Sequence, residues 1–163
     1  MSILLIMSKE YINIYNNFIK LTTNKILYKG INKVDTFSDR MIFFLIHFAF
    51  FLKVYKKKDN ANLLQEIYDF VFRQLELSIR EIGYGDQSIN KKMKDYVNLF
   101  YSILEKIEIW ENLNQFDKLQ LLNKYMNIKE DNDLFVSYFD KYRDFLLKNT
   151  LKNFTKDILE LKF

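Results

Sequence analysis

Apolar residues recur at intervals of three or four along most of the chain, the spacing that places them on one face of an α-helix. Polar stretches and glycines interrupt this pattern and mark the ends of helices. The expected helices cover residues 8–28, 35–58, 60–82, 88–111, 115–127, 132–148 and 151–161. The pattern therefore predicts an all-α fold, a single compact bundle of six to seven helices.

Residue types at the helix ends support several of these boundaries. Ser8 and Asn60 are expected N-caps for the first and third helices. Thr36 and Asp39 have the spacing of a capping box, in which each side chain accepts a backbone N–H at a helix start. Gly83 is expected to end the third helix in a left-handed conformation.

The most apolar stretch is residues 41–52, MIFFLIHFAFFL. As a helix it rises about 18 Å, well short of the roughly 30 Å of a bilayer's hydrocarbon core. We interpret it as a buried core helix. The first residues lack the charged leader and the long apolar region of a signal peptide. We therefore expect a cytoplasmic protein with neither an export signal nor a transmembrane helix.

The composition excludes several classes of functional site. The 163 residues include no cysteine, no proline, three glycines and one histidine. A disulfide, a thiolate or multi-histidine metal site and a glycine-rich phosphate loop are therefore excluded. We predict no cofactor, no metal and no enzymatic activity. A chain of this length is expected to form one domain, residues 1–163.

Positive charge is concentrated in residues 1–60, with 10 basic and 4 acidic side chains, where Lys25, Lys29 and Lys33 have four-residue spacing. Lys91, Lys92 and Lys94 crowd the start of the fourth helix, where the helix dipole disfavours cations. Such a surface attracts phosphate, lipid headgroups, ribosomal RNA or an acidic protein face. A lysine-rich coding bias explains the same residues equally well. The excess is too small to predict a DNA partner.

Two further charged or polar residues border on the apolar run. His47 is expected to be a neutral core histidine with both ring nitrogens hydrogen-bonded, rather than a ligand of metal or haem. Arg40 is expected to reach water or a carboxylate, and an ion pair with Glu81 or Asp86 would satisfy it. A catalytic site built from Arg80, Glu81 and Asp86 is a weaker alternative, because adjacent Arg80 and Glu81 diverge on a helix.

Residues 78–94, SIREIGYGDQSINKKMK, join two long helices through a tight turn that contains Gly83 and Gly85. Asp86 or Ser88 is expected to cap the helix that follows. Together with DTFSDR at 35–40, the helix around His47 and residues 97–101, this segment resembles the ubiquinol–cytochrome c chaperone family over about residues 11–108. The chain departs from the family pattern at Val34, Asp39 and Asn90, which replace proline, glycine and proline. The candidate motif or partner-binding residues are Asp35, Arg40, His47, Arg80, Glu81, Gly83, Gly85, Asp86, Lys91, Lys92, Met93 and Lys94.

The resemblance implies a non-enzymatic assembly chaperone for the ubiquinol–cytochrome c reductase, which binds newly made cytochrome b or a similar hydrophobic membrane-protein client. Mitochondrial members work with a small partner subunit at the ribosome exit. The missing transit peptide favours a bacterial-type member, peripheral to the inner membrane on its cytoplasmic side. Residues 112–163 are expected to form a helical C-terminal extension of the family-like core.

Two physical routes to function remain open from the sequence. In the first, a groove lined by Phe, Tyr and Met of the second to fourth helices, beside the glycine turn, receives an apolar client helix. The alternative is a peripheral module that binds anionic lipid or RNA without a specific client.

Overall fold

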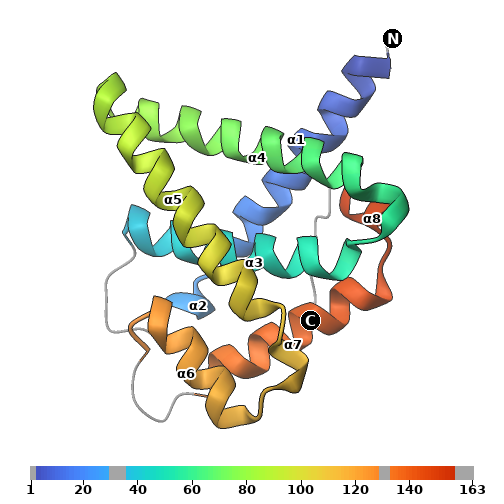
Figure 1. Cartoon of the computed structure of the whole chain (residues 1–163), viewed down its shortest axis with the longest axis vertical. Helices are drawn as coiled ribbons and strands as arrows, with labels where there is room; N and C mark the ends of the chain where they lie inside the picture. Colours follow the sequence, from blue (N-terminus) through green and yellow to red (C-terminus); the bar gives the residue numbers. More distant parts are fainter. Residues whose placement is uncertain (1–2, 30–35, 129–132, 157–163) are drawn as a thin grey trace.

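The computed structural model describes residues 3–29, 36–128 and 133–156, whose regular structure is helical (Figure 1). Short 3₁₀ turns, η1 (Lys58–Asn60) and η2 (Trp110–Asn112), lie between helices. The helices are α1 (Ile3–Thr22), α2 (Ile26–Lys29), α3 (Phe37–Tyr55), α4 (Ala61–Glu81), α5 (Asp86–Ile107), α6 (Gln115–Tyr125), α7 (Leu134–Lys148) and α8 (Leu151–Phe154). The predicted all-α bundle is confirmed. Six of these helices have eleven or more residues, counted over the ranges just given.

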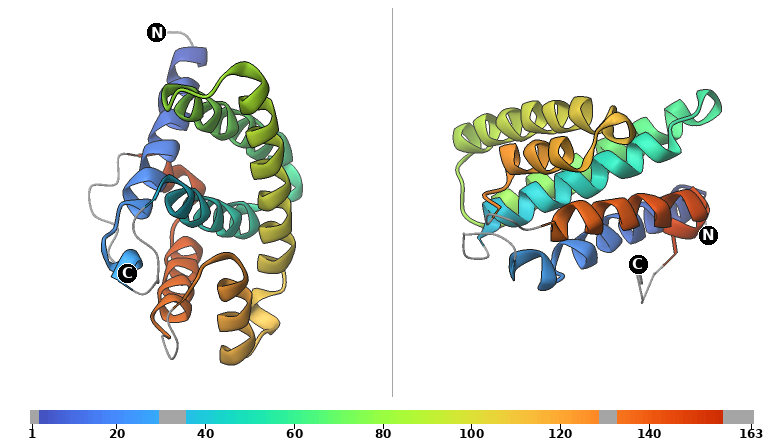
Figure 2. Two further views of the ribbon diagram at one scale, coloured as in Figure 1. Left: turned by 90° about the vertical axis from the view of Figure 1, so that its left-hand side faces the viewer. Right: turned by 90° about the horizontal axis from the view of Figure 1, so that it is seen from below.

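Helix α3 lies at the centre of the bundle. It packs against α5 on one side and against α1 and α7 on the other (Figure 2). Its side chains from Phe43 to Phe51 are all buried, because neighbouring helices cover every face of it. The interpretation of residues 41–52 as a core helix is confirmed. Within the described ranges, no helix has both the length and the apolar character needed to cross a bilayer.

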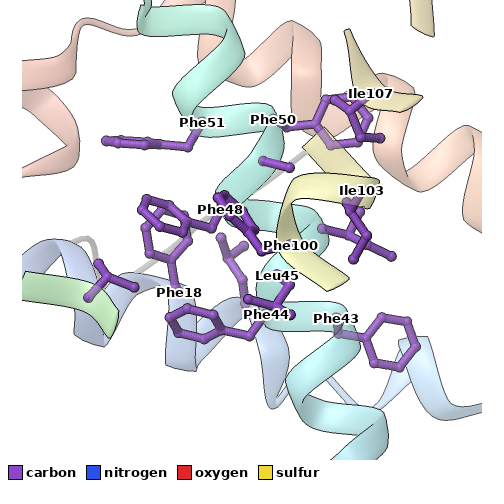
Figure 3. Packing of buried hydrophobic residues seen from close by; sticks show 14 of the residues in the cluster. Phe18, Phe43, Phe44, Leu45, Phe48, Phe50, Phe51, Phe100, Ile103 and Ile107 are labelled. Carbon is purple, nitrogen blue, oxygen red and sulfur yellow. The ribbon is translucent and has the colours of Figure 1, made fainter. Parts of the chain in front are cut away.

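Aromatic rings connect the central helix to its neighbours. Phe48 of α3 lies 5.3 Å from Phe18 of α1 and stacks on Phe100 of α5 at 5.2 Å, measured between ring centroids (Figure 3). Tilted and stacked ring pairs of this kind add about 0.5–1.5 kcal/mol each to the burial of their surface. Most of the phenylalanines are therefore committed to the core, and only a few are free to meet a partner.

The first predicted helix is divided in the structure. Helix α1 begins at Ile3, so Ser8 lies inside the helix and the expected N-cap is wrong. A break after Thr22 ends α1, and the Asn24 side chain accepts the backbone N–H of Ile26 at 3.2 Å where α2 begins. Since Lys25 lies in this break and Lys29 ends α2, they do not share one helical stripe. Lys33, Val34 and Asp35 lie outside the described residues.

The corner between α3 and α4 also differs from the prediction. Helix α3 ends at Tyr55, before the lysines that were expected to extend it. Asn60 is the N-cap residue of α4, but its side chain makes no capping bond. Its amide instead donates to the Tyr55 carbonyl at 2.6 Å and accepts the Lys57 N–H at 2.9 Å. This side chain therefore holds the corner together.

The C-terminal helices pack into the same hydrophobic core as α3. The Tyr142 hydroxyl of α7 donates to the His47 carbonyl at 3.0 Å, and the Tyr55 hydroxyl donates to the Leu146 carbonyl at 2.9 Å. Helix α6 packs on α7, and the short α8 packs on α1. Burial raises the pKa of Tyr55 to about 12, and burial also raises the pKa of Tyr142, so both hydroxyls stay protonated donors.

Candidate functional site

A sharp turn joins α4 to α5 at the upper left of Figure 1, and we call residues 82–85 the glycine elbow. The Gly83 N–H donates to the Arg80 carbonyl at 2.9 Å as the helix ends. Gly83 has φ +104°, a conformation that costs energy for any residue with a Cβ atom. The predicted left-handed helix stop at Gly83 is confirmed.

An arginine bridges the two sides of the glycine elbow. Arg80 donates to the Asp86 carboxylate at 2.7 Å and to Glu76, one turn earlier on α4, at 3.1 Å. The hydrogen bond that Arg80 donates to Asp86, followed by the one to Glu76, raises the pKa of the Arg80 guanidinium. The N-cap of α5 is Gly85, which makes no side-chain capping bond, so the expected cap from Asp86 or Ser88 is wrong.

The expected partner of Arg40 is also wrong. Asp86 pairs with Arg80, and Glu81 forms no ion pair with Arg40 within the described ranges. Adjacent positions on a helix point in different directions, so Arg80 and Glu81 do not form one charged cluster. Arg40 instead lines a surface hollow next to α1.

The start of α3 is held by the predicted capping box, which is confirmed. The Thr36 hydroxyl accepts the Asp39 N–H at 3.2 Å, and the Asp39 carboxylate accepts the Thr36 N–H at 3.2 Å. The Thr36 hydroxyl also donates to this carboxylate at 2.8 Å. Because both ends of the box are satisfied, the first turn of α3 is fixed. The turn presents Phe37, whose side chain is partly exposed, at the surface.

A hollow of about 190 Å³ lies between the glycine elbow and the start of α3. Three segments supply its walls, namely the first turn of α3, the end of α4 with the elbow, and the second and third turns of α5. The lining residues are Thr36, Phe37, Ser38, Ile79, Ile82, Tyr84, Lys92 and Tyr96. The two sequence blocks that carry the resemblance, at 35–40 and 78–94, thus meet around one hollow.

A second hollow, of about 170 Å³, adjoins the first and shares Phe37 with it. Its walls come from α1, α3 and α4, with Ile19 and Phe44 among the apolar side chains and Arg40 among the polar ones. The Tyr15 hydroxyl and the Ser78 hydroxyl lie 3.2 Å apart at this hollow. Burial raises the pKa of Tyr15.

We call the two hollows and the apolar side chains around them the elbow face. Four large apolar side chains there keep more than a third of their surface exposed: Ile82 at 51%, Tyr84 at 38%, and Phe37 and Ile19 at 37%. Exposed apolar groups gathered beside concave surface are typical of sites that bind another protein. Ile82 and Tyr84, on either side of Gly83 in a turn, were the signal in the sequence that could have located this face.

The lysines of α5 do not act as one patch. The ammonium of Lys92 lies 5.1 Å from the centre of the Tyr84 ring, a cation–π contact at the edge of the first hollow. Met93 packs against the core. Lys91 and Lys94 are exposed and do not line this hollow. The elbow face therefore has a single lysine at its α5 edge.

His47 lies in the core and does not line the elbow face. Its Nδ1 is 2.6 Å from the Phe43 carbonyl, which can only accept, so Nδ1 carries the proton. Its Nε2 then accepts a hydrogen bond from the Tyr138 hydroxyl of α7 at 2.7 Å. Burial lowers the pKa of His47 to about 4, although the bond to Phe43 acts in the opposite direction. The expectation of a neutral, fully hydrogen-bonded core histidine is confirmed.

In the part of the chain that the structure describes, no three His, Cys, Asp or Glu side chains gather as a metal ion would require. The elbow face offers exposed apolar surface with Lys92 and Arg40 among its polar lining residues. Such a surface suits the apolar side chains of another polypeptide.

Comparison with known proteins agrees with the motifs around the elbow. A family model described as Ubiquinol-cytochrome C chaperone matches residues 31–126, more than half of the chain. The matched range contains the parts of the elbow face that come from α3, α4 and α5, and it extends through α6. No curated protein and no solved structure matches the chain.

Proposed function

The chain belongs to the ubiquinol-cytochrome C chaperone family, and we propose that it holds an apolar helix of a newly made membrane protein on the elbow face. Cytochrome b of the ubiquinol–cytochrome c reductase is the client that we propose. The chaperone then acts by binding alone, without catalysis, and keeps the client from aggregating until its partners arrive.

The shape of the elbow face supports this mode of binding. A client helix presents large side chains at intervals of three or four residues along one face. The two hollows lie on either side of Phe37 and are each of a size for one or two such side chains. Ile82, Tyr84 and Ile19 add apolar surface around them, and burial of this surface contributes roughly 25 cal/mol per Å² before the costs of association.

The observation that carries the proposal is the meeting of the two motif blocks. Residues 36–38 and residues 79–96 are far apart in the sequence, yet both line the first hollow. Arg80, Gly83 and Asp86 do not line it, and their contacts fix the turn on which Ile82 and Tyr84 are displayed. The motif therefore serves to build a binding surface, and not a reaction centre.

Site-specific photocrosslinking in the native cell tests the proposal. A photoreactive phenylalanine analogue in place of Phe37 or Ile82 should crosslink to nascent or newly made cytochrome b. The same analogue in place of Phe116 of α6, which is 66% exposed and does not line the elbow face, is the control. Crosslinks to cytochrome b of equal yield from all three positions, or from none of them, would contradict the proposal.

The alternative, a lipid- or RNA-binding module without a client, predicts a different result. Under this alternative, charge reversal at Lys91 and Lys92 should abolish all binding. If the elbow face binds a client, the same charge reversal should only weaken client capture.

We also propose that the protein works at the cytoplasmic side of the inner membrane, with a small partner subunit and close to the ribosome exit.

A further inference from the structure

A second apolar groove lies at the end of the α4–α5 hairpin that is farther from the elbow. It has a volume of about 250 Å³ and runs between the last turns of α3, the first half of α4 and the second half of α5. Its apolar lining consists of Leu52, Ala61, Leu64, Tyr68, Phe100, Tyr101 and Leu104. Tyr101 is 56% exposed in spite of its size. The proposed client site does not use this groove.

Another hollow, of about 330 Å³, lies on the other side of the same corner. It is enclosed by the end of α3, the corner residues, the end of α7 and the start of α8. Val54, Leu147 and Leu151 supply apolar surface, and Leu147 is largely exposed. The corner between α3 and α4 is thus flanked by two hollows with apolar walls.

Three consecutive lysines occupy this corner, and we call Lys56, Lys57 and Lys58 the lysine corner. All three are exposed; Lys56 lines the groove on one side, and Lys57 lines the hollow on the other. Their ammonium groups have no hydrogen bond or ion pair with any described residue. Lys53 differs, because its ammonium donates to the carbonyls of Ile107 and Glu108 at 2.8 Å and pairs with Glu111.

The neighbouring charges leave an excess of positive charge at this end. Asp59 follows the lysine corner in η1, and Glu108 lines the groove. Lys148 ends α7 and Lys152 lies in α8, the two helices that border the second hollow. Basic side chains next to accessible apolar surface are a combination by which proteins attach to anionic bilayers.

We propose that the lysine corner docks on an anionic phospholipid bilayer, with its ammonium groups on the lipid phosphates and the two flanking hollows facing the glycerol and acyl region. Val54, Leu147 and Leu151 give the second hollow an aliphatic wall, which suits acyl chains. Nucleic-acid bases stack on open aromatic faces, and Tyr101 of the groove is the one largely exposed ring among the described residues beside the corner, so RNA binding is an outcome of the test below. This inference rests on the proposed function, since it names the surface that holds the chaperone at the membrane. The elbow face, at the other end of the α4–α5 hairpin, remains free for the client.

Two lysine trios with equal charge provide a matched test on the full chain. Co-sedimentation is measured with phosphatidylcholine vesicles that contain or lack phosphatidylglycerol. The triple variant K56E/K57E/K58E should lower binding to the anionic vesicles by roughly tenfold or more. The variant K91E/K92E/K94E carries the same change in net charge at the elbow end and should lower it by no more than about threefold. Circular dichroism checks that both variants keep their helix content.

Contact with the acyl region is measured separately. Trp110 is the single tryptophan and is fully buried, so the variant Tyr101→Trp adds one exposed reporter on the groove. Brominated lipids should quench the added fluorescence in anionic vesicles and leave that of Trp110 unchanged. Equal loss of binding in both lysine variants, absence of quenching, or binding to RNA in place of vesicles would overturn the inference. Crosslinking from Phe37 and Ile82 reports on the proposed function independently of this result.

Discussion

Arg80 and Asp86 form an ion pair of 2.7 Å across the glycine elbow, joining the last turn of α4 to the first residue of α5. Glu76 holds the same guanidinium from one turn earlier. Both members of the pair are well exposed, so its main effect is on the geometry of the turn and less on the stability of the fold. Residues 80–86, REIGYGD, thus form a tight helix–helix turn that displays Ile82 and Tyr84.

The two glycines of the elbow should respond differently to the same substitution. Gly83→Ser forces a residue with a Cβ atom into a positive φ and should lower the free energy of unfolding by about 1–2 kcal/mol. Gly85 has an ordinary φ of −73° at the N-cap of α5, where serine is favourable. Gly85→Ser should therefore change the free energy of unfolding by less than about 0.5 kcal/mol. Urea unfolding measures both, and equal losses would contradict the assignment of the turn to Gly83.

The single histidine gives a direct check on the core. The folded pKa of about 4 lies below the ordinary 6.5, so only the unfolded chain gains a proton as the pH falls through 6.5. Stability should therefore decrease as the pH falls, by about 2 kcal/mol between pH 7 and pH 5 from this group. The imidazole NMR signal of His47 should stay constant over the same range. A signal that titrates near 6.5 would show that the ring is not buried as described.

The Glu111 carboxylate of η2 forms ion pairs with both α3 and α7. Glu111 accepts from Lys53, and from Arg143 of α7 at 2.6 Å. Burial alone would raise the pKa of Glu111, but the hydrogen bonds from Lys53 and Arg143 outweigh it and lower the pKa to about 2. The stabilisation is therefore complete above pH 4.5 and is lost as the pH falls from 4.5 towards 2.

The variant Glu111→Gln tests these ion pairs. Because the group is partly exposed and screened by solvent, we expect a loss of only about 1 kcal/mol at pH 7. The difference between the variant and the unchanged chain should shrink towards zero near pH 2.5, measured by thermal unfolding at each pH. A difference that is constant with pH would show that the ion pairs do not contribute.

Local and periodic features of the fold could be predicted from the sequence. The capping box at Thr36 and Asp39, the helix stop at Gly83 and the buried run in α3 depend on residues close together in the chain, and the structure confirms them. The apolar run without a charged residue also placed His47 correctly, because neighbouring helices had to cover α3 on all sides.

Features that depend on tertiary contacts could not be predicted. The choice of Arg80 over Arg40 as the partner of Asp86 follows from the sharpness of the elbow, which periodicity does not show. The break after Thr22 and the start of α1 at Ile3 were missed because no proline or glycine marks either place. A groove beside the glycine turn was expected from the sequence, but its walls were not. Which apolar side chains of α1, α3 and α4 stay exposed there depends on how these helices pack.

The central claim is that the elbow face holds a client for the reductase, and one comparison tests it most directly. In a strain lacking the gene, complementation with Ile82→Glu is compared with complementation by Phe116→Glu, an equally polar change at an exposed apolar residue of α6. The amount of assembled cytochrome b is read from the reduced-minus-oxidised spectrum of the membranes, with its transcript as the reference. We expect Ile82→Glu to leave assembled cytochrome b as low as the deletion does, and Phe116→Glu to restore it. Full restoration by Ile82→Glu would contradict the account.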